Sequence, residues 1–398
     1  MIVPQTRAQC LEWDRQDPLA SRRALFRLPD NVIYLDGNSL GALTAAAGQR
    51  VQDVLQAEWG HDLIQSWTCN GWLDYPARLG DRVGRLMAAA PGETLVCDST
   101  SVNLFKLVAA ASLERGKRYK IVTESGNFST DLHILQGVAR LSPDLEIKVV
   151  SRGDVLSAID DQTFLVVLTH VHYRSAEMYD LAGVTEYVHA RGARVLWDLS
   201  HSIGAVPLDL PASRADFAVG CSYKYLNGGP GAPAFLYVRH DLQGSLQPVL
   251  SGWLGDRAPF AFNDDYEPAA GIDRHRCGTP AILSYAALDG ALAAFDELEM
   301  AQIREKSILL SELFIRRVES CPQAARLTLA SPRDALLRGS HVSFAHGAAA
   351  EVMRRLIERG VIGDFRPPDL LRFGFTPLYL RYVDVWDAVE ILADELER

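Results

Sequence analysis

The chain has few lysines and no surplus of positive charge. Its 398 residues include six lysines, at positions 106, 117, 120, 148, 224 and 306, and its formal net charge is −10 at pH 7. Nucleic acids and anionic membranes bind basic surfaces, so we expect neither as a partner. Because lysine is scarce, a lysine in a distinctive sequence context deserves a functional interpretation.

Cysteine patterns and long apolar runs are also missing. The six cysteines (10, 69, 97, 221, 277 and 321) form no CxxC pair and no metal-ligand spacing, so we expect reduced thiols, no metal site and a cytoplasmic protein. No apolar run approaches the ~18 residues of a membrane span. The N-terminus shows no apolar signal core. With 48% hydrophobic and 23% charged residues, the composition is that of an ordinary globular protein.

Short runs of Val, Ile and Leu alternate with helical stretches between residues 80 and 240. This alternation predicts an α/β protein whose mainly parallel sheet is covered on both faces. We expect strands at 120–123, 146–150, 163–168, 194–198, 217–222 and 234–238, and helices at 79–90, 102–114, 130–140 and 183–191.

The two ends of the chain are expected to form other parts of the molecule. Helical patterns cover 7–28, 44–59 and 280–320, and residues 325–398 read as a smaller α+β domain. We therefore predict an N-terminal arm with part of the small domain at 1–50, a large cofactor-binding domain at 51–280 and a small C-terminal domain at 281–398.

Lys224 lies between two tyrosines after an apolar run, and a glycine-rich turn follows it. Asp198 ends another apolar run, with His201 three residues later. An enzyme that uses pyridoxal 5'-phosphate (PLP) needs such a pair. The lysine forms a Schiff base with the cofactor, and the carboxylate keeps the pyridine nitrogen protonated so that the ring accepts electrons. A surface lysine in a strand-turn is the simpler alternative.

Two predicted helix starts could complete a cofactor site. Residues 98–101, Asp-Ser-Thr-Ser, would either cap a helix or hold a phosphate through hydroxyls, free N–H groups and the helix dipole. Phe128 would either join the core or stack on the pyridine ring. Phe128, Thr169, Asp198 and Lys224 all lie at or just after predicted strand ends, where parallel sheets bind ligands.

Seven segments, in order and at comparable spacing, resemble kynureninase: 34–41, 98–104, 128–131, 197–202, 222–231, 252–255 and 276–280. The GNSLG and YKYLNGGPG segments together are the most specific, and the resemblance covers essentially the whole chain. It implies the aspartate aminotransferase-type PLP fold and a homodimer with shared active sites. It also implies hydrolysis of L-kynurenine to anthranilate and L-alanine in the kynurenine pathway of tryptophan catabolism, which connects to NAD biosynthesis. Whether 3-hydroxykynurenine, which would give 3-hydroxyanthranilate, is preferred stays open.

The resemblance also implies roles for individual residues. The catalytic residues are Lys224, Asp198 and Tyr223. The cofactor-binding residues are Thr100, Ser101, Phe128, Ser129, Thr130, Asp131, Thr169, Asp198, His201, Tyr223, Lys224, and, across the dimer interface, Trp253 and Thr279. The substrate-binding residues are Arg372, Asn38, Ser39 and His61. Arg372 would hold the α-carboxylate, because a planar guanidinium pairs naturally with a carboxylate.

The chain departs from the family pattern at three places. The loop 170–177 differs from the usual sequence, although Thr169 is kept. Thr279 stands where animal-type members carry Asn, which bears on preference for a ring hydroxyl. His61 aligns only loosely with a substrate-facing histidine of animal-type members.

Two alternatives use the same fold. A cysteine desulfurase or class V aminotransferase is the first, and a desulfurase would need a cysteine in a mobile loop near 320–335, where only Cys321 is found. A non-catalytic relative is the second, and it would be expected to lack Lys224, Asp198 or Arg372.

Overall fold

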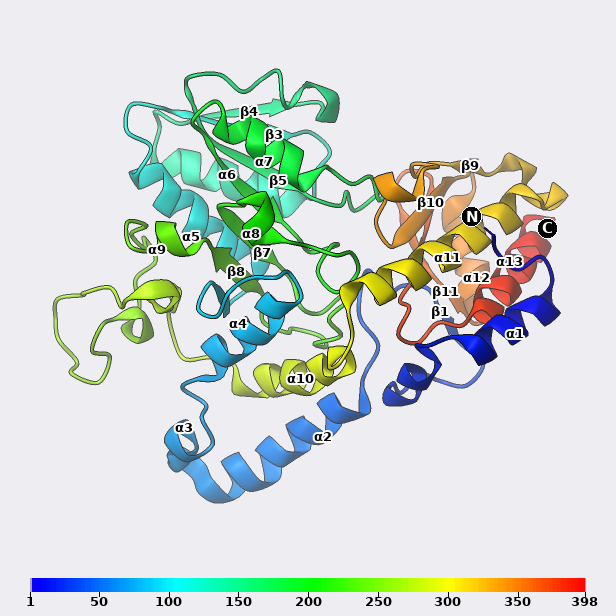
Figure 1. The fold of residues 1–398 in the computed structure, drawn as a ribbon, viewed down its shortest axis with the longest axis horizontal. Helices are drawn as coiled ribbons and strands as arrows, with labels where there is room; N and C mark the ends of the chain where they lie inside the picture. The colour runs from blue at the N-terminus through cyan, green and yellow to red at the C-terminus, as the bar shows by residue number, and fades with distance from the viewer. Residues whose placement is uncertain (1, 398) are drawn as a thin grey trace.

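A seven-stranded sheet forms the centre of the larger half of the molecule (Figure 1), in a computed structural model that describes residues 2–397. The strand order is β2-β8-β7-β6-β5-β3-β4. Neighbouring strands from β7 to β4 are parallel, whereas β8 is antiparallel to both β7 and β2. The strands are β2 (Thr94–Val96), β3 (Lys120–Glu124), β4 (Glu146–Val150), β5 (Thr163–Thr169), β6 (Arg194–Asp198), β7 (Phe217–Gly220) and β8 (Phe235–Val238). The predicted α/β class and mainly parallel sheet are confirmed.

Helices cover both faces of this sheet. Every residue of β5 is buried, as expected for a central parallel strand. Leu165 and Val167 belong to one apolar cluster with residues of α5 and α6, whereas Val166 and Leu168 belong to another with residues of α4 and α7. The helices are α4 (Tyr75–Arg85), α5 (Thr100–Leu113), α6 (Ser129–Leu141) and α7 (Leu181–His189).

A second, antiparallel sheet with strand order β12-β13-β10-β9 lies in the other half, with α11, α12 and α13 (Figure 1). The N-terminal segment joins it, because β1 pairs in parallel with β11 and α1 packs on α13. The strands are β1 (Ile33–Tyr34), β9 (Thr328–Leu329), β10 (His341–Ala345), β11 (Val361–Ile362), β12 (Asp364–Arg366) and β13 (Leu370–Gly374). The helices are α1 (Arg7–Gln16), α11 (Met300–Glu319), α12 (Ala349–Glu358) and α13 (Tyr382–Leu396).

The predicted long helices are interrupted in the structure. The stretch 280–320 contains α10 (Ile282–Leu292) and α11, because Glu297 adopts a positive φ of 62° and Glu299 starts a capping box for α11. The predicted helix at 7–28 ends at Gln16, because the proline at 18 favours extended backbone at Asp17. The division of the chain at residues 50 and 280 stays a prediction, which the β1–β11 pairing supports for the N-terminal segment.

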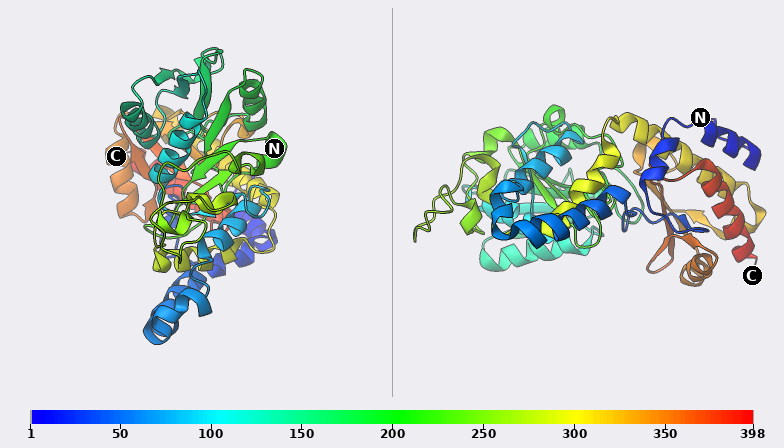
Figure 2. Two further views of the ribbon diagram at one scale, coloured as in Figure 1. Left: turned by 90° about the vertical axis from the view of Figure 1, so that its left-hand side faces the viewer. Right: turned by 90° about the horizontal axis from the view of Figure 1, so that it is seen from below.

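Helix α2 (Ala45–Asp53) and the following π-helix, Val54–Asp62, extend away from the sheet toward α3 (Ser66–Cys69) (Figure 2). The helix predicted at 44–59 is therefore confirmed as continuously helical from Ala45, but its second part is a π-helix that continues to Asp62. Helix α2 packs closely against α10 at Gly290. A Cβ atom there would lie 2.4 Å from the carbonyl oxygen of Ala46 and 2.6 Å from Cα of Ala47. The two backbones can approach this closely only because position 290 has no side chain.

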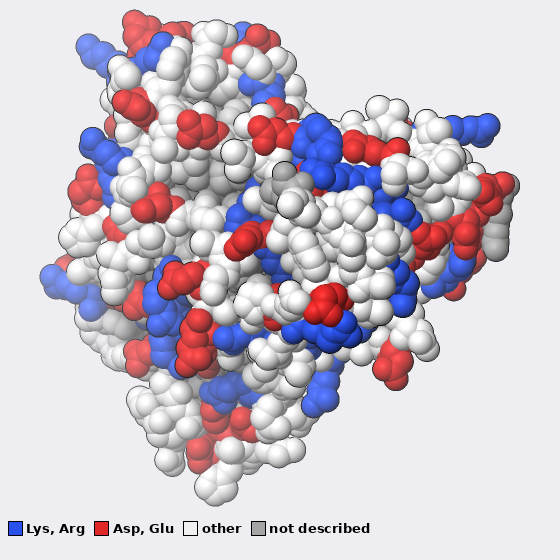
Figure 3. Space-filling view, turned by 45° about the vertical axis from the view of Figure 1, so that its right-hand side comes forward, with Lys and Arg blue, Asp and Glu red and all other residues white. Residues whose placement is uncertain are grey.

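Acidic and basic side chains lie interspersed over the face drawn in Figure 3. None of the helices within residues 2–397 combines the length and apolarity that crossing a bilayer requires.

Two glycine substitutions should have opposite effects on stability. Gly290→Ala should destabilise the protein by about 1–3 kcal/mol, because the new methyl group collides with backbone. Gly48, on α2, has no atom within 4 Å of a built Cβ, so Gly48→Ala should stabilise by up to ~1 kcal/mol through helix propensity. Thermal unfolding midpoints of both variants provide the measurement. A Gly290→Ala midpoint at or above wild type would contradict the α2–α10 packing.

Candidate active site

A cavity of about 160 Å³ lies where β5, β6 and the loop after β7 end. The carboxyl ends of parallel strands and the N-termini of α5 and α6 meet there, the usual ligand position in such a sheet. Its lining residues are Ser99, Thr100, Ser101, Phe128, Thr130, Asp131, Thr169, Tyr173, Asp198, Ser200, His201, Tyr223 and Lys224. All of the predicted cofactor-binding residues except Ser129, Trp253 and Thr279 therefore share one cavity.

Lys224 is held in a tight loop after β7. Its Nζ lies 2.9 Å from Nε2 of His201. Segment 36–41 supports the loop, since the N–H of Gly41 donates to the carbonyl of Tyr223 at 2.7 Å. A Cβ at position 41 would lie 2.2 Å from the Lys224 carbonyl oxygen. The GNSLG and YKYLNGGPG motifs therefore form one packed unit around the lysine.

Two buried carboxylates face the cavity. Asp198, at the end of β6, accepts a hydrogen bond from the N–H of Ser200 at 2.7 Å, and burial raises its pKa. Asp131, in the first turn of α6, has a pKa raised by burial and then by the charge of Asp198. Its Oδ2 accepts from Asn127 Nδ2 at 2.9 Å, while Oδ1 has no partner among the described residues. Buried carboxylates of this kind are stabilised by a protonated ring nitrogen or another cationic partner.

His201 is kept neutral. Burial, followed by the charge of Lys224, lowers its pKa well below the usual value. A neutral imidazole can accept a hydrogen bond from the Lys224 ammonium through Nε2. Its Nδ1 is buried and has no partner among the described residues, so the ring has hydrogen-bonding capacity left for a ligand.

The residues at the start of α5 cap the helix and line the cavity. The side chain of Ser99 accepts from the N–H of Val102 at 3.3 Å and caps the helix. Thr100 and Ser101 follow it and line the cavity. Free N–H groups and hydroxyls at the N-terminus of a 14-residue helix are suited to an anion such as a phosphate. Both interpretations of this segment thus apply: Ser99 caps the helix, and Ser99, Thr100 and Ser101 all line the cavity.

Phe128 remains 45% exposed in the cavity, so it is not a core residue. The ring of Tyr173 stands nearly perpendicular to it, with centroids 5.5 Å apart. One face of Phe128 is therefore accessible to a planar ligand. Together with Asp198, His201 and the α5 N-terminus, this arrangement fits PLP: a stacking ring, a carboxylate for the ring nitrogen, a lysine for the aldehyde and donors for the phosphate.

Arg372 lies behind Tyr173 and is 1% exposed. Its Nη1 donates to the carbonyl of Tyr173 at 2.5 Å, its Nη2 to Ser39 Oγ at 2.8 Å and its Nε to Asp364 at 2.8 Å. The structure thus brings together two of the predicted substrate-binding residues, Arg372 and Ser39. Asn38 is fully buried next to them, and neither polar atom of its amide has a partner among the described residues. Their roles toward substrate stay predictions.

Three predicted residues lie away from this cavity. Trp253 is 40% exposed and lines a groove of its own, and Thr279 lines a cavity with Arg276 and Cys277. His61, on the π-helix, has a side chain 87% exposed and paired with Asp62. Within one chain none of the three contacts the Lys224 site. Ser129 begins α6 but does not line the cavity.

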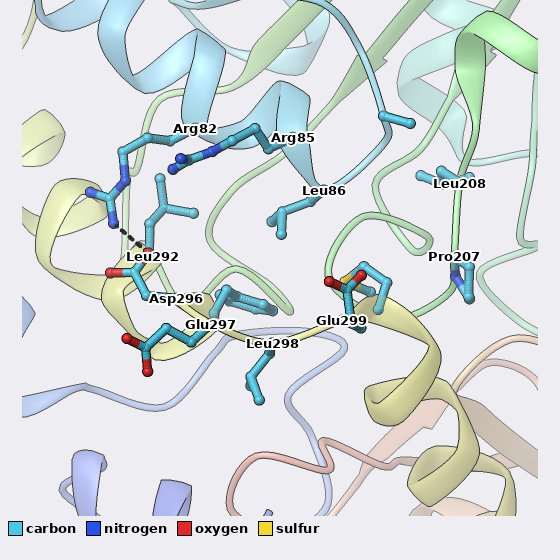
Figure 4. Close-up of a pocket in the computed structure, with 13 residues that line it drawn as sticks. Arg82, Arg85, Leu86, Pro207, Leu208, Leu292, Asp296, Glu297, Leu298 and Glu299 are labelled. Atoms are coloured by element: carbon cyan, nitrogen blue, oxygen red, sulfur yellow. Dashed lines mark ion pairs between the residues drawn. The ribbon is translucent and has the colours of Figure 1, made fainter.

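A larger cavity of about 500 Å³ lies between α4 and the α10–α11 connection (Figure 4). Arg82 and Asp296 form an ion pair at its edge, 3.5 Å apart. It contains none of the predicted site residues, so volume alone does not locate the site.

Sequence reasoning missed several residues of the site. Tyr173 lies in the loop that departs from the family pattern, and Ser200 lies within the segment 197–202 but was given no role. Asp364 pairs with Arg372 across the β12–β13 hairpin. The Pro-Pro-Asp turn at 367–369 could have predicted this pairing, since 364 and 372 are equidistant from its centre.

A family model described as "Kynureninase C-terminal domain" matches residues 303–392. Kynureninase of Burkholderia pseudomallei (strain 1106a) is 50% identical over 99% of this chain and 96% of its own length. Kynureninase of Pseudomonas fluorescens is 48% identical over the same shares.

Solved structures with lower identity share the fold. Cysteine desulfurase CsdA from Escherichia coli superposes with a TM-score of 0.81 at 19% identity, covering 95% of this chain and 98% of that one. A C-DES mutant with glycine covalently linked to its PLP cofactor gives a TM-score of 0.80 at 18% identity, covering 92% and 97%. At such identities the likeness shows the fold alone.

The fold and the cavity define a PLP-dependent enzyme of the aspartate aminotransferase fold type. The two kynureninases that align over nearly the whole chain identify the family within this class. The chain belongs to the kynureninase family, and the predicted family, fold class, enzyme class and cofactor are confirmed.

Proposed function

We propose that this protein hydrolyses L-kynurenine to anthranilate and L-alanine with PLP as its cofactor. The observation that carries the proposal is that Lys224, Asp198 and the N-terminus of α5 line one cavity, with the Arg372–Ser39 pair directly behind its Tyr173 wall. This is the arrangement required to fix a cofactor and an amino-acid substrate together.

The cofactor supplies an electron sink for the bond-breaking steps at the substrate's α- and β-carbons. Lys224 would anchor the cofactor, and its free amine would move the proton at the substrate's Cα. Asp198 stabilises the protonated ring nitrogen. His201, held neutral beside Lys224, accepts a hydrogen bond from the lysine and fixes the position of Nζ.

Tyr223 contributes as a donor. Burial raises the pKa of its phenol, so the hydroxyl stays protonated at neutral pH. A protonated phenol can donate to the oxygen that becomes negative when water adds to the substrate ketone.

Product analysis tests the proposal. The purified, PLP-loaded protein should release anthranilate and alanine in equal amounts from L-kynurenine. Parallel incubation with 3-hydroxykynurenine shows which ring form is preferred. Borohydride reduction followed by peptide mapping should place the cofactor on Lys224. Attachment at any of the other five lysines, or no aromatic amine product, would refute the assignment.

Asp198→Ala should retain PLP but lose turnover on the order of 10³-fold or more, because an unprotonated pyridine accepts electrons poorly. A matched control is Asp216→Ala. Asp216 is also a buried carboxylate of this sheet, but it pairs with His189 and Arg239 at the start of β7. The control should lower stability while leaving turnover per folded molecule near wild type. Asp198→Ala activity within tenfold of wild type would remove Asp198 from the mechanism.

We further propose a homodimer in which Trp253 and Thr279 reach the partner's cofactor. Both lie outside their own chain's cavity, and Trp253 starts a row of exposed aromatic rings with Phe260 and Phe262. Phe260 and Phe262 are 59% and 76% exposed. Exposed apolar patches of this kind commonly mark protein interfaces.

Subunit complementation tests shared sites. Lys224→Ala and Trp253→Ala chains should each be nearly inactive, and mixing them should restore up to about a quarter of wild-type activity, because one hybrid site in two contains both intact residues. A mixture of Lys224→Ala with Asp198→Ala provides the control. Lys224 and Asp198 belong to the same chain's site, so every site in this second hybrid lacks one of the two residues. The control mixture should therefore stay inactive. Activity in the control mixture, or none in the first, would contradict the proposed sharing.

The cellular setting is proposed on the sequence alone. The cysteine spacing suggests a cytoplasmic enzyme, and its reaction would belong to tryptophan catabolism and, through it, to the route toward NAD.

A further inference from the structure

Asp364 is the partner of the arginine that would hold the substrate. It lies on β12, directly opposite Arg372 on β13, so the two side chains lie on the same face of the sheet. Asp364 Oδ1 accepts from Arg372 Nε at 2.8 Å, and Oδ2 accepts from Nη2. Although burial opposes it, the hydrogen bond from Arg372 holds the pKa of Asp364 below its usual value.

This pairing fixes which edge of the guanidinium is available. An arginine presents two forks to a carboxylate, the Nε–Nη2 edge and the Nη1–Nη2 end. Asp364 occupies the first. The second points to Ser39 Oγ and to the carbonyl of Tyr173, a cavity-lining residue. The Tyr173 carbonyl oxygen thus stands where one oxygen of an incoming carboxylate would bind.

The charge around Asp364 leaves room for a further anion. Arg366, two residues along β12, also donates to Asp364 Oδ2, at 2.6 Å. Two guanidinium groups therefore share one carboxylate, so the cluster of Asp364, Arg366 and Arg372 carries one net positive charge. Asp36 lies close enough for its charge to interact with all three, but burial and the charge of Asp364 raise its pKa to about 7, so near neutral pH it offsets this positive charge only in part. A substrate carboxylate at the Nη1–Nη2 end would balance it.

We propose that Asp364 is the positioning residue for α-carboxylate recognition, holding Arg372 so that its Nη1–Nη2 end faces the cavity. The inference rests on the proposed function and deepens it. Ser39 assists, because its hydroxyl donates to Asp364 at 2.9 Å while accepting from Arg372. Asp364 itself does not contact the substrate.

The test compares two small ligands that differ only in the carboxylate. L-alanine and ethylamine are titrated into the PLP-loaded protein, and the change in visible absorption of the cofactor gives each dissociation constant. Asp364→Asn should weaken L-alanine binding by roughly 10–100-fold, the range for losing a charge-assisted hydrogen bond. Ethylamine binding and PLP content should change less than twofold. In turnover, KM for L-kynurenine should rise by a similar factor with kcat nearly kept.

Glu312→Gln is the matched control. Glu312 is another buried carboxylate of this half of the molecule, paired with the buried Arg338 and with Arg333, and it lies outside the site. It should leave both dissociation constants unchanged. A double variant, Asp364→Asn with Arg372→Lys, should bind L-alanine no more weakly than Arg372→Lys alone, because Asp364 acts through Arg372.

Several results would overturn the proposal. These are wild-type L-alanine binding in folded Asp364→Asn, equal weakening of ethylamine, additive losses in the double variant, or no measurable L-alanine binding by wild type. If Asp364→Asn does not fold, Asp364→Glu keeps the charge but displaces the fork, and it should weaken L-alanine about tenfold; a wild-type value there would equally refute the role. Absence of anthranilate release by wild type that still binds L-alanine would refute the proposed hydrolysis alone.

Discussion

The contact between Gly41 and the Tyr223 carbonyl joins the two halves of the site. Segment 36–41 reaches the Lys224 loop from the N-terminal side, and the same segment carries Ser39, which is hydrogen-bonded to Arg372. One short segment therefore connects the lysine that anchors the cofactor to the arginine that would hold the substrate. The 2.2 Å approach of a built Cβ at position 41 to the Lys224 carbonyl shows that any side chain there would separate them.

Electrostatics constrains the site as strongly as packing does. Asp131 and Asp198 are both buried, and burial raises the pKa of each; the charge of Asp198 raises the pKa of Asp131 further. Behind Tyr173 the balance is reversed, because Arg366 and Arg372 share Asp364. The cavity thus has an acidic side suited to a protonated ring and a basic side suited to a carboxylate. A cofactor with a protonated ring and a substrate with a carboxylate would together balance the charges of the two sides.

Much of the large half could be predicted from the sequence, because buried parallel strands are continuous apolar runs, as in β5, and because Asp198 and Lys224 stand at strand ends. Short strands such as β2 and β12 could not be predicted, because three residues are too few to show an alternation of apolar and polar residues. The π-helix after α2 could not be distinguished from a continuing α-helix by its composition. Tyr173 was missed for another reason. Its position depends on a loop that folds against Arg372, a contact made 199 residues away along the chain.

The cofactor side and the substrate side of the site come from different halves of the molecule. Asp198 ends β6 of the seven-stranded sheet and Lys224 lies in the loop after β7, whereas Arg372 and Asp364 belong to the antiparallel hairpin β12–β13. The distance between the cofactor and the bound carboxylate is therefore set by how the two halves pack. Tyr173 lies at that boundary, touching Phe128 with its ring and Arg372 with its carbonyl. A substrate carboxylate that takes the place of the Tyr173 carbonyl must displace this loop, so substrate binding and the packing of the two halves are coupled through one residue.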